Sequence, residues 1–283
     1  MANYFQKTYN AEVLKEWITL EMKRNAISMF LETRSKYLAV LLTKQHTERQ
    51  VSSQEGSIPE ASEAIPNGHL TRENIEATMD STINGLNDTI TRATLESDSF
   101  LRLRRAKNTD AQSILDLVNG LAIYEKEPHE VDVTLDIYFR DCEGESPFFH
   151  CVLLEEMSCE DLEFRKVVGM GFWYLGYTIK GGRHLYLEDL FIQTDYRGHG
   201  CGKAIMYCLA EIASTLKCQR FIWQALDWNT PALNFYKSIG ANICSEFTTI
   251  RLNQGDMKTF SASSSPLLKG KIKVTCSGTK YEG

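Results

Sequence analysis

The sequence lacks a long hydrophobic run, and this absence excludes one class of protein. Its uninterrupted apolar stretches, such as Tyr37 to Leu42, are far shorter than the roughly 20 residues that a membrane-spanning helix needs. Near the N-terminus, Glu12 and Glu16 precede any apolar core of the kind that a secretory signal contains. We therefore expect a cytoplasmic protein with no membrane partner.

Two further patterns are missing, namely paired cysteines and an excess of positive charge. The eight cysteines all lie at or after Cys142, and no two of them form a Cys-x-x-Cys pair. We therefore expect reduced, packed thiols, with neither a disulfide framework nor a bound metal. The net charge of −6 argues against a nucleic-acid partner, which needs a basic surface, and it permits a cationic ligand.

The first hundred residues differ in composition from the remainder. Apolar residues recur at alternating steps of four and three from Val13 to Leu41, which predicts a long amphipathic helix over about 11–47. Such a helix packs on its own domain or mediates association. The polar stretch 51–69 contains two prolines and no periodicity, as is typical of a linker. We therefore expect a helical extension (1–50), a polar and partly disordered linker (51–98), a folded domain (99–260) and a flexible tail (261–283).

Residues 99–260 read as alternating strands and helices, which predicts an α/β domain. Aromatic and β-branched residues mark the strands, and apolar residues at helical spacing mark the helices. The expected strands cover about 100–103, 148–154, 167–177, 184–192, 221–226 and 241–252. The expected helices cover about 109–121, 202–216 and 231–239. We expect this domain to fold without the preceding residues.

The most informative segment, Arg197-Gly-His-Gly-Cys-Gly202, connects an expected strand to an expected helix. Its alternating glycines allow successive backbone N–H groups to point in one direction, and the helix N-terminus adds a partial positive charge. The turn is therefore a candidate phosphate site. It is not a P-loop, because Arg197 and Ala204 stand where glycine and Ser/Thr are needed, and Lys203 excludes the dinucleotide-binding fingerprint.

This segment resembles the acetyl-CoA loop of the GNAT N-acetyltransferase superfamily. Within that superfamily, the chain resembles the spermidine/spermine and thialysine N-acetyltransferases over about Phe100 to Phe260. The matching stretches are LYLEDLFIQTDYRGHGCGKAI, ALDWNTPALNFYKSIGA and IYEKEPHE. The resemblance implies a GNAT fold, which is a mixed, mostly antiparallel twisted sheet flanked by helices. It also implies acetyl-CoA as cosubstrate and a homodimer.

The chemistry of amine acetylation explains two of the matching residues. A primary ammonium has a pKa near 10.4, so on the order of one molecule in 10³ is the neutral nucleophile at pH 7, and a base must help. In the resembling family, the glutamate that matches Glu188 receives the proton. Strand alternation predicts that Tyr186, Glu188 and Leu190 share one face, with Leu187 and Asp189 on the other.

Tyr236 matches the general acid of the family, which returns a proton to the leaving thiolate. The resemblance also implies a set of acetyl-CoA contacts, which are Leu190, Phe191, Ile192, Arg197, Gly198, His199, Gly200, Cys201, Gly202, Lys203, Asn229, Thr230, Pro231, Ala232 and Tyr236. A backbone N–H within 190–192 would stabilise the negative charge that develops on the acetyl carbonyl oxygen. The implied substrate contacts are Tyr124, Glu125, Glu188, Ile222, Trp223 and Gln224.

The amine itself stays open at this point. The stretch Tyr124 to Glu145 is rich in carboxylates, as expected either of a wall that collects cations or of a solvated helix and loop. Ser238 and Ile239 follow Lys237 where the polyamine branch is basic, which removes one expected CoA phosphate contact. We expect direct transfer in a ternary complex to a polyamine, diamine, thialysine or ornithine-like amine. The alternatives are a protein or peptide N-acetyltransferase and a non-catalytic acyl-CoA-binding protein.

Overall fold

The computed structural model describes residues 12–14, 17–31, 70–93, 99–142, 146–158, 160–161, 163–244, 249–251 and 257–259. The chain divides into two compact units, Thr19–Cys244 and a second one that combines Met1–Ile18 with Ser245–Gly283. In the second unit, β1 (Glu12–Leu14) and β9 (Thr249–Arg251) pair antiparallel. Within the described ranges, no helix is both long enough and apolar enough to cross a bilayer.

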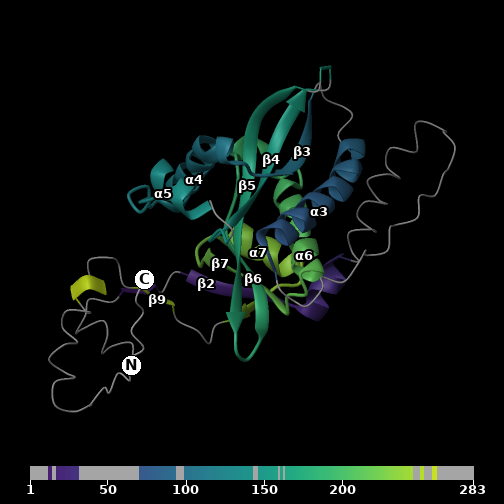
Figure 1. Ribbon diagram of the computed structural model, residues 1–283. Helices are drawn as coiled ribbons and strands as arrows, with labels where there is room; N and C mark the ends of the chain where they lie inside the picture. Colours follow the sequence, from purple (N-terminus) through teal and green to yellow (C-terminus); the bar gives the residue numbers. More distant parts are fainter. Residues whose placement is uncertain are drawn as a thin grey trace, which may run out of the picture. The chain divides into compact units, whose positions relative to one another are not determined.

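The larger unit is built on a seven-stranded sheet with the strand order β3-β4-β5-β6-β7-β2-β8 (Figure 1). Strands β3 to β6 pair antiparallel in succession, β6 and β7 pair parallel, and β2 pairs antiparallel with β8. The strands are β2 (Trp17–Lys23), β3 (Ser99–Arg105), β4 (His150–Ser158), β5 (Phe164–Thr178), β6 (Gly182–Ile192), β7 (Arg220–Leu226) and β8 (Asn242–Cys244). This mixed, mostly antiparallel sheet confirms the expected fold class.

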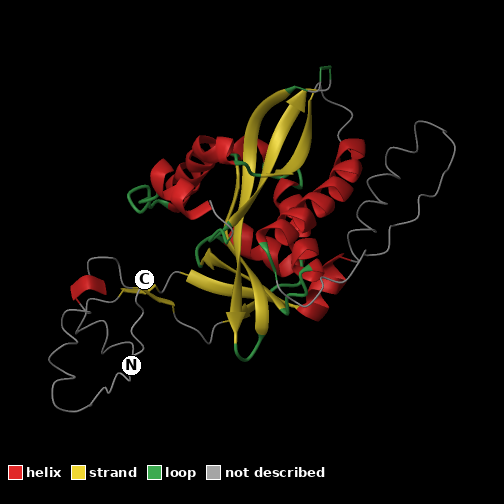
Figure 2. Ribbon diagram, in the orientation of Figure 1, coloured by secondary structure: helices red, strands yellow, loops and turns green. Residues whose placement is uncertain are grey.

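Helices cover both faces of this sheet (Figure 2). They are a helix over 24–31, α3 (Arg72–Ala93), α4 (Ala111–Glu125), α5 (Leu135–Cys142), α6 (Cys201–Thr215) and α7 (Thr230–Ser238), with short 3₁₀ turns η2 (Asn108–Asp110) and η3 (Thr194–Tyr196). Helices α3 and α6 lie against one face, and α4 and α5 against the other. On the α6 face, a Cβ added to Gly171 would meet Ile205 of α6 at 2.6 Å, so the small residue permits close packing.

The expected helix over about 11–47 is wrong for its first part. Residues 12–14 and 17–23 are strands, and within this segment only 24–31 are described as helix. In β2, Leu20 and Met22 are fully buried, as in a strand, where every second residue points to the same side. The sequence of this segment is compatible with the helical period of 3.6 and with the strand period of two, and pairing with β8 stabilises the strand. Residues 32–47 lie outside the described residues.

The expected linker also contains a long helix. Helix α3 presents Ile75, Met79, Ile83 and Leu86 at helical spacing, and all four are buried. It lies against β3 and α6, so this part of 51–98 belongs to the packed structure. The expectation for 51–69 concerns residues outside those described, as does the expected tail.

The final expected strand, 241–252, is two strands in two different units. Strand β8 belongs to the seven-stranded sheet, whereas β9 pairs with β1. Helix α5 lies within 124–145, which the sequence left open as an acidic wall or a solvated helix and loop. The unit Thr19–Cys244 starts before the expected domain 99–260, and the limits of the part that folds by itself stay a prediction.

Candidate active site

The glycine turn between β6 and α6 has the backbone conformation that its sequence predicts. Gly198 and Gly200 have φ values of 79° and 85°, in the left-handed region that other residues rarely adopt. Gly200 is the N-cap of α6, and Gly202 lies inside the first turn of that helix. The first N–H groups of a 15-residue helix therefore adjoin the turn, which suits it to a phosphate-bearing ligand.

The sheet opens beside this turn. The parallel ladder of β6 and β7 runs from His184 with Arg220 to Leu187 with Trp223, and both strands continue beyond it. The backbone of residues 188–192 thus faces a gap in the sheet next to the N-terminus of α6. The positive helix end, the glycine turn and this gap together fit the phosphates and the extended arm of acetyl-CoA. When bound here, acetyl-CoA would supply an activated acetyl group beside residues 188–192.

A β-bulge reorganises β6 at the expected base. The pairing of β5 with β6 shifts between Phe172, opposite Asp189, and Trp173, opposite Leu187. Leu187 packs towards α6, whereas Asp189 lies opposite Phe172 on the α4 side. Glu188 is the extra residue, so Glu188 and Asp189 both line one cavity. The expectation that they occupy opposite faces is wrong, because the bulge interrupts the alternation.

This cavity, of about 430 Å³, is strongly acidic. Its carboxylates come from α4, the loop after it, α5 and the bulge of β6, and they are Glu125, Glu127, Glu130, Asp132, Asp141, Glu188 and Asp189. The remaining wall is largely apolar, including Leu121, Val131 and Phe172. No Lys, Arg or His is among the residues that line it. A cation with an aliphatic portion therefore complements the cavity in charge and in polarity.

The environment raises the pKa of three of these carboxyls. Burial and the neighbouring Asp189 and Glu127 raise the pKa of Glu125 to about 7. Burial, and to a smaller extent Glu188, raises the pKa of Asp189 to about 7 as well. Burial also raises the pKa of Glu188. With pKa values of about 7, Glu125 and Asp189 exchange protons near neutral pH, as general bases must.

The expected general acid, Tyr236, lies in α7 and is buried. Its ring packs edge-on against Trp223 with centroids 5.2 Å apart. Burial, followed by the charge of Glu125 and the neighbouring Tyr124, raises the pKa of Tyr236. The phenol is therefore protonated at neutral pH and able to donate.

Tyr124 and Arg197 connect the acidic side of the site to the glycine turn. The Tyr124 hydroxyl donates to Oδ1 of Asn229 at 3.1 Å, and Asn229 also accepts from the backbone N–H of Ala232 as the N-cap of α7. The Arg197 guanidinium lies 4.6 Å from the centre of the Tyr124 ring, and its Nε donates to the carbonyl of Ile192. These contacts bring together α4, α7 and the end of β6.

The other expected residues are positioned differently. Of the expected substrate contacts, only Glu125 and Glu188 line the acidic cavity. Gln224 donates to Thr19 Oγ1 of β2 at 3.3 Å, and Trp223 is buried against Tyr236. Cys201 is buried, and burial raises the pKa of its thiol, which does not favour a nucleophilic role. The roles assigned from the sequence stay proposals for all site residues.

Sequence reasoning missed Asp189 and the more distant carboxylates of the cavity as individual site residues. The signal that could have found Asp189 is its place beside Glu188, but only the register with β5 reveals the bulge. Helix α5 supplies Asp141 from a segment that was expected only as an acidic region.

Comparison with known proteins agrees with this geometry. Residues 112–241 match the family model described as the acetyltransferase (GNAT) family. The chain is 37% identical over 149 residues to the thialysine N-epsilon-acetyltransferase of Bos taurus, which covers 52% of this chain and 88% of that protein. It is 30% identical over 145 residues to spermidine/spermine N(1)-acetyltransferase-like protein 1 of Homo sapiens, covering 51% of this chain and 21% of that one.

A solved integron cassette protein from the mobile metagenome of V. cholerae superimposes with a TM-score of 0.46 at 22% identity, over 57% of this chain and 97% of that one. The sequence relatives, the family match and the glycine turn agree on one assignment. The chain belongs to the GNAT family and is an acetyl-CoA-dependent amine N-acetyltransferase.

Proposed function

We propose that the chain transfers the acetyl group of acetyl-CoA to the primary amine of a small aliphatic polyamine, diamine or thialysine-like amino acid. The observation that supports this most strongly is the acidic cavity. It has seven carboxylate residues, no basic residue and an apolar wall. Such a cavity favours a compact cation with methylene groups over a neutral or anionic acceptor.

The proposed mechanism is direct transfer within a ternary complex. The carboxylates around Glu188 and Asp189 hold the ammonium and take its proton, either directly or through water. A pKa of about 7 for Asp189 and for Glu125 suits this task better than an ordinary carboxyl value, because the base is then matched to neutral pH.

Backbone N–H groups in 190–192, beside the gap between β6 and β7, would stabilise the negative charge on the acetyl carbonyl oxygen. The buried, protonated hydroxyl of Tyr236 would then supply a proton to the leaving sulfur. The remaining acetyl-CoA contacts expected from the sequence form the turn 197–203 and the start of α7 at 229–232.

The test is acetyl-CoA turnover against a panel of acceptors. The panel contains spermidine, a short diamine, thialysine, ornithine, lysine and a lysine-containing peptide. We expect the highest kcat/KM for a small aliphatic amine and low turnover for the peptide. Preferential acetylation of the peptide would contradict the proposal and favour a protein N-acetyltransferase.

A further inference from the structure

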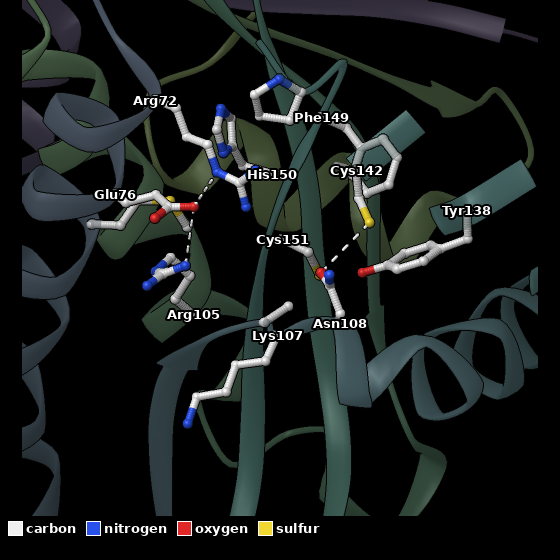
Figure 3. A pocket seen from close by; sticks show the side chains of 13 residues that line it. Arg72, Glu76, Arg105, Lys107, Asn108, Tyr138, Cys142, Phe149, His150 and Cys151 are labelled. Carbon is white, nitrogen blue, oxygen red and sulfur yellow. Dashed lines mark hydrogen bonds and ion pairs between the residues drawn. The ribbon is translucent and has the colours of Figure 1, made fainter. Parts of the chain in front are cut away.

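A second cavity, of about 280 Å³, adjoins the acidic one and differs from it in charge (Figure 3). Its lining comes from α3, the end of β3, α5 and the start of β4. Three of the lining residues are cationic, Arg72, Arg105 and Lys107, and one is a carboxylate, Glu76. The lining therefore carries an excess of positive charge in a chain whose net charge is −6.

Glu76 bridges the two guanidiniums of this cavity, and Arg105 also pairs with Asp80, with 3.3 Å between Nε and Oδ1. Oε1 of Glu76 lies 2.8 Å from Nε of Arg72 and 3.2 Å from Nη1 of Arg105. Figure 3 shows the three side chains grouped on one side of the cavity. Guanidiniums fixed in this way are oriented in advance, so an arriving anion orders fewer side chains.

Uncharged residues line the rest of the cavity; some are apolar, such as Met79 and Pro147, and others can form hydrogen bonds. Asn108 and Tyr138 lie opposite the arginines in Figure 3, with the Tyr138 hydroxyl directed towards Asn108. His150 packs against Trp173 with ring centroids 4.7 Å apart. Burial lowers the pKa of His150 to about 4, so at neutral pH its ring offers one donor and one acceptor without a charge. Such a lining suits a small polar anion.

Two aromatic residues form a wall that both cavities share. Tyr138 and Phe149 line the basic cavity and the acidic cavity alike. Their ring centroids are 5.2 Å apart, and Phe149 stacks on Phe172, which lines the acidic cavity, at 4.3 Å. A molecule that contacts this wall from the basic cavity therefore changes the shape and the electrostatic potential of the acidic cavity.

We propose that the basic cavity binds a small carboxylate- or phosphate-bearing effector, and that its binding strengthens amine binding in the adjoining acidic cavity. An anion and a cation on opposite sides of the wall attract each other, so each favours the other. Arg72 and Glu76 lie on α3, before Phe100, where the resemblance to the family begins, so this part of the proposed site comes from the segment that precedes the matching domain. The coupling, but not the binding, rests on the proposed function.

The first measurement is binding to the full-length protein. Inorganic phosphate and malonate are titrated by calorimetry in a buffer without other multivalent anions. We expect saturable binding that weakens about tenfold or more in Arg72→Gln, since a hydrogen bond to a charged group is lost. Arg72→Lys should retain part of the affinity, and Lys180→Gln, an exposed lysine outside this cavity, should retain all of it. Lys107→Gln serves as a second variant should Arg72→Gln melt at a lower temperature than the unaltered chain.

The second measurement is the KM of the amine with and without saturating phosphate. We expect phosphate to lower KM by about fivefold in the unaltered chain and to leave it unchanged in Arg72→Gln. The site assignment is overturned by the absence of saturable binding, or by equal affinity in all variants. An unchanged or raised KM despite binding overturns the coupling. A chain that binds phosphate but acetylates no amine contradicts the proposed function and leaves the binding site supported.

Discussion

A substitution at Tyr236 can distinguish a role in proton transfer from a role in packing. It is buried against Trp223, yet the neighbouring Glu125 and Tyr124 also affect its pKa, so it lies between the apolar core and the acidic side of the site. Tyr236→Phe keeps the ring and removes only the hydroxyl group. We expect kcat to fall on the order of 10²-fold while acetyl-CoA affinity stays close to that of the unaltered chain. An unchanged kcat in steady-state assays would assign Tyr236 to packing alone.

The adjacent carboxylates of the bulge should differ in their effect on the pH–rate profile. Glu188→Gln should make turnover depend more steeply on alkaline pH, because only amine that is already neutral reacts without a base. Asp189→Asn should move the inflection near pH 7 to lower pH, because Asp189 helps to raise the pKa of Glu125. Profiles of kcat/KM from pH 5 to 10 test both effects. Identical profiles for the two variants and the unaltered chain would exclude both residues from proton transfer.

The same aspartate should reduce stability at alkaline pH. Its pKa rises from an ordinary 3.8 to about 7 in the folded chain, so between these values the folded form retains a proton that the unfolded form has released. The stabilisation is therefore complete below about pH 4 and disappears as the pH rises through about 7. Asp189→Asn should match the unaltered chain near pH 4 and exceed it at pH 8 by about 1–3 kcal/mol, since each pKa unit is worth about 1.4 kcal/mol and the cavity is open to solvent.

Urea unfolding at the two pH values measures this difference. Asp227→Asn, at an exposed aspartate, is the matched control and should show no pH-dependent gain. Equal free energies of unfolding for Asp189→Asn and the unaltered chain at pH 8 would contradict the raised pKa.

At the scale of elements, an ion network fixes the start of α4, whose other end carries Tyr124 and Glu125. Nε of Arg104 on β3 lies 2.6 Å from Oε2 of Glu155, a buried carboxylate on β4. The same guanidinium contacts both carboxylate oxygens of Asp110, at 2.6 and 2.8 Å. Burial opposes ionisation of Asp110, but hydrogen bonds from Arg104 and the Lys107 backbone lower its pKa overall.

Arg104→Ala should therefore destabilise the chain by about 3–5 kcal/mol, because it leaves buried carboxylates without this partner. Arg102→Ala is the control, since Arg102 also contacts Glu155 but has a side chain that is 43% exposed. We expect a loss of about 1 kcal/mol or less for Arg102→Ala. Denaturant titration of both variants tests the difference, and equal losses would contradict the special role of Arg104.

The elements also show what the sequence could and could not predict. The turn 197–202 was predictable because its conformation depends on its own glycines, and the structure confirms it at Gly198 and Gly200. The sequence could not predict that Glu188 and Asp189 line the same cavity, because the bulge that places them there depends on pairing with β5. The basic cavity was not predictable either, because four elements combine to form it.

At the scale of the whole molecule, residues 19–31 belong to the unit that carries the site. The alternation of Ile18, Leu20 and Met22 fits a helix or a strand in sequence, and the sheet selects the strand. Leu20, Met22, Ile27 and Phe30 are all buried within the unit Thr19–Cys244. Strand β2 lies between β7 and β8 in the sheet, so it is the neighbour of β7, which borders the proposed acetyl-CoA gap.

Leu20→Asp should therefore abolish cooperative melting or lower stability by several kcal/mol, because a fully buried leucine contributes about 1.5–3 kcal/mol and an unpaired buried charge adds a further penalty. Lys23→Asp, at an exposed position of the same strand, should melt close to the unaltered chain. Removal of residues 1–96 should have at least the effect of Leu20→Asp, since it also deletes α3 with its buried Met79. If the shortened chain melts cooperatively and acetylates amines at the full rate, β2 and α3 are dispensable additions, and the domain folds from about residue 99 alone.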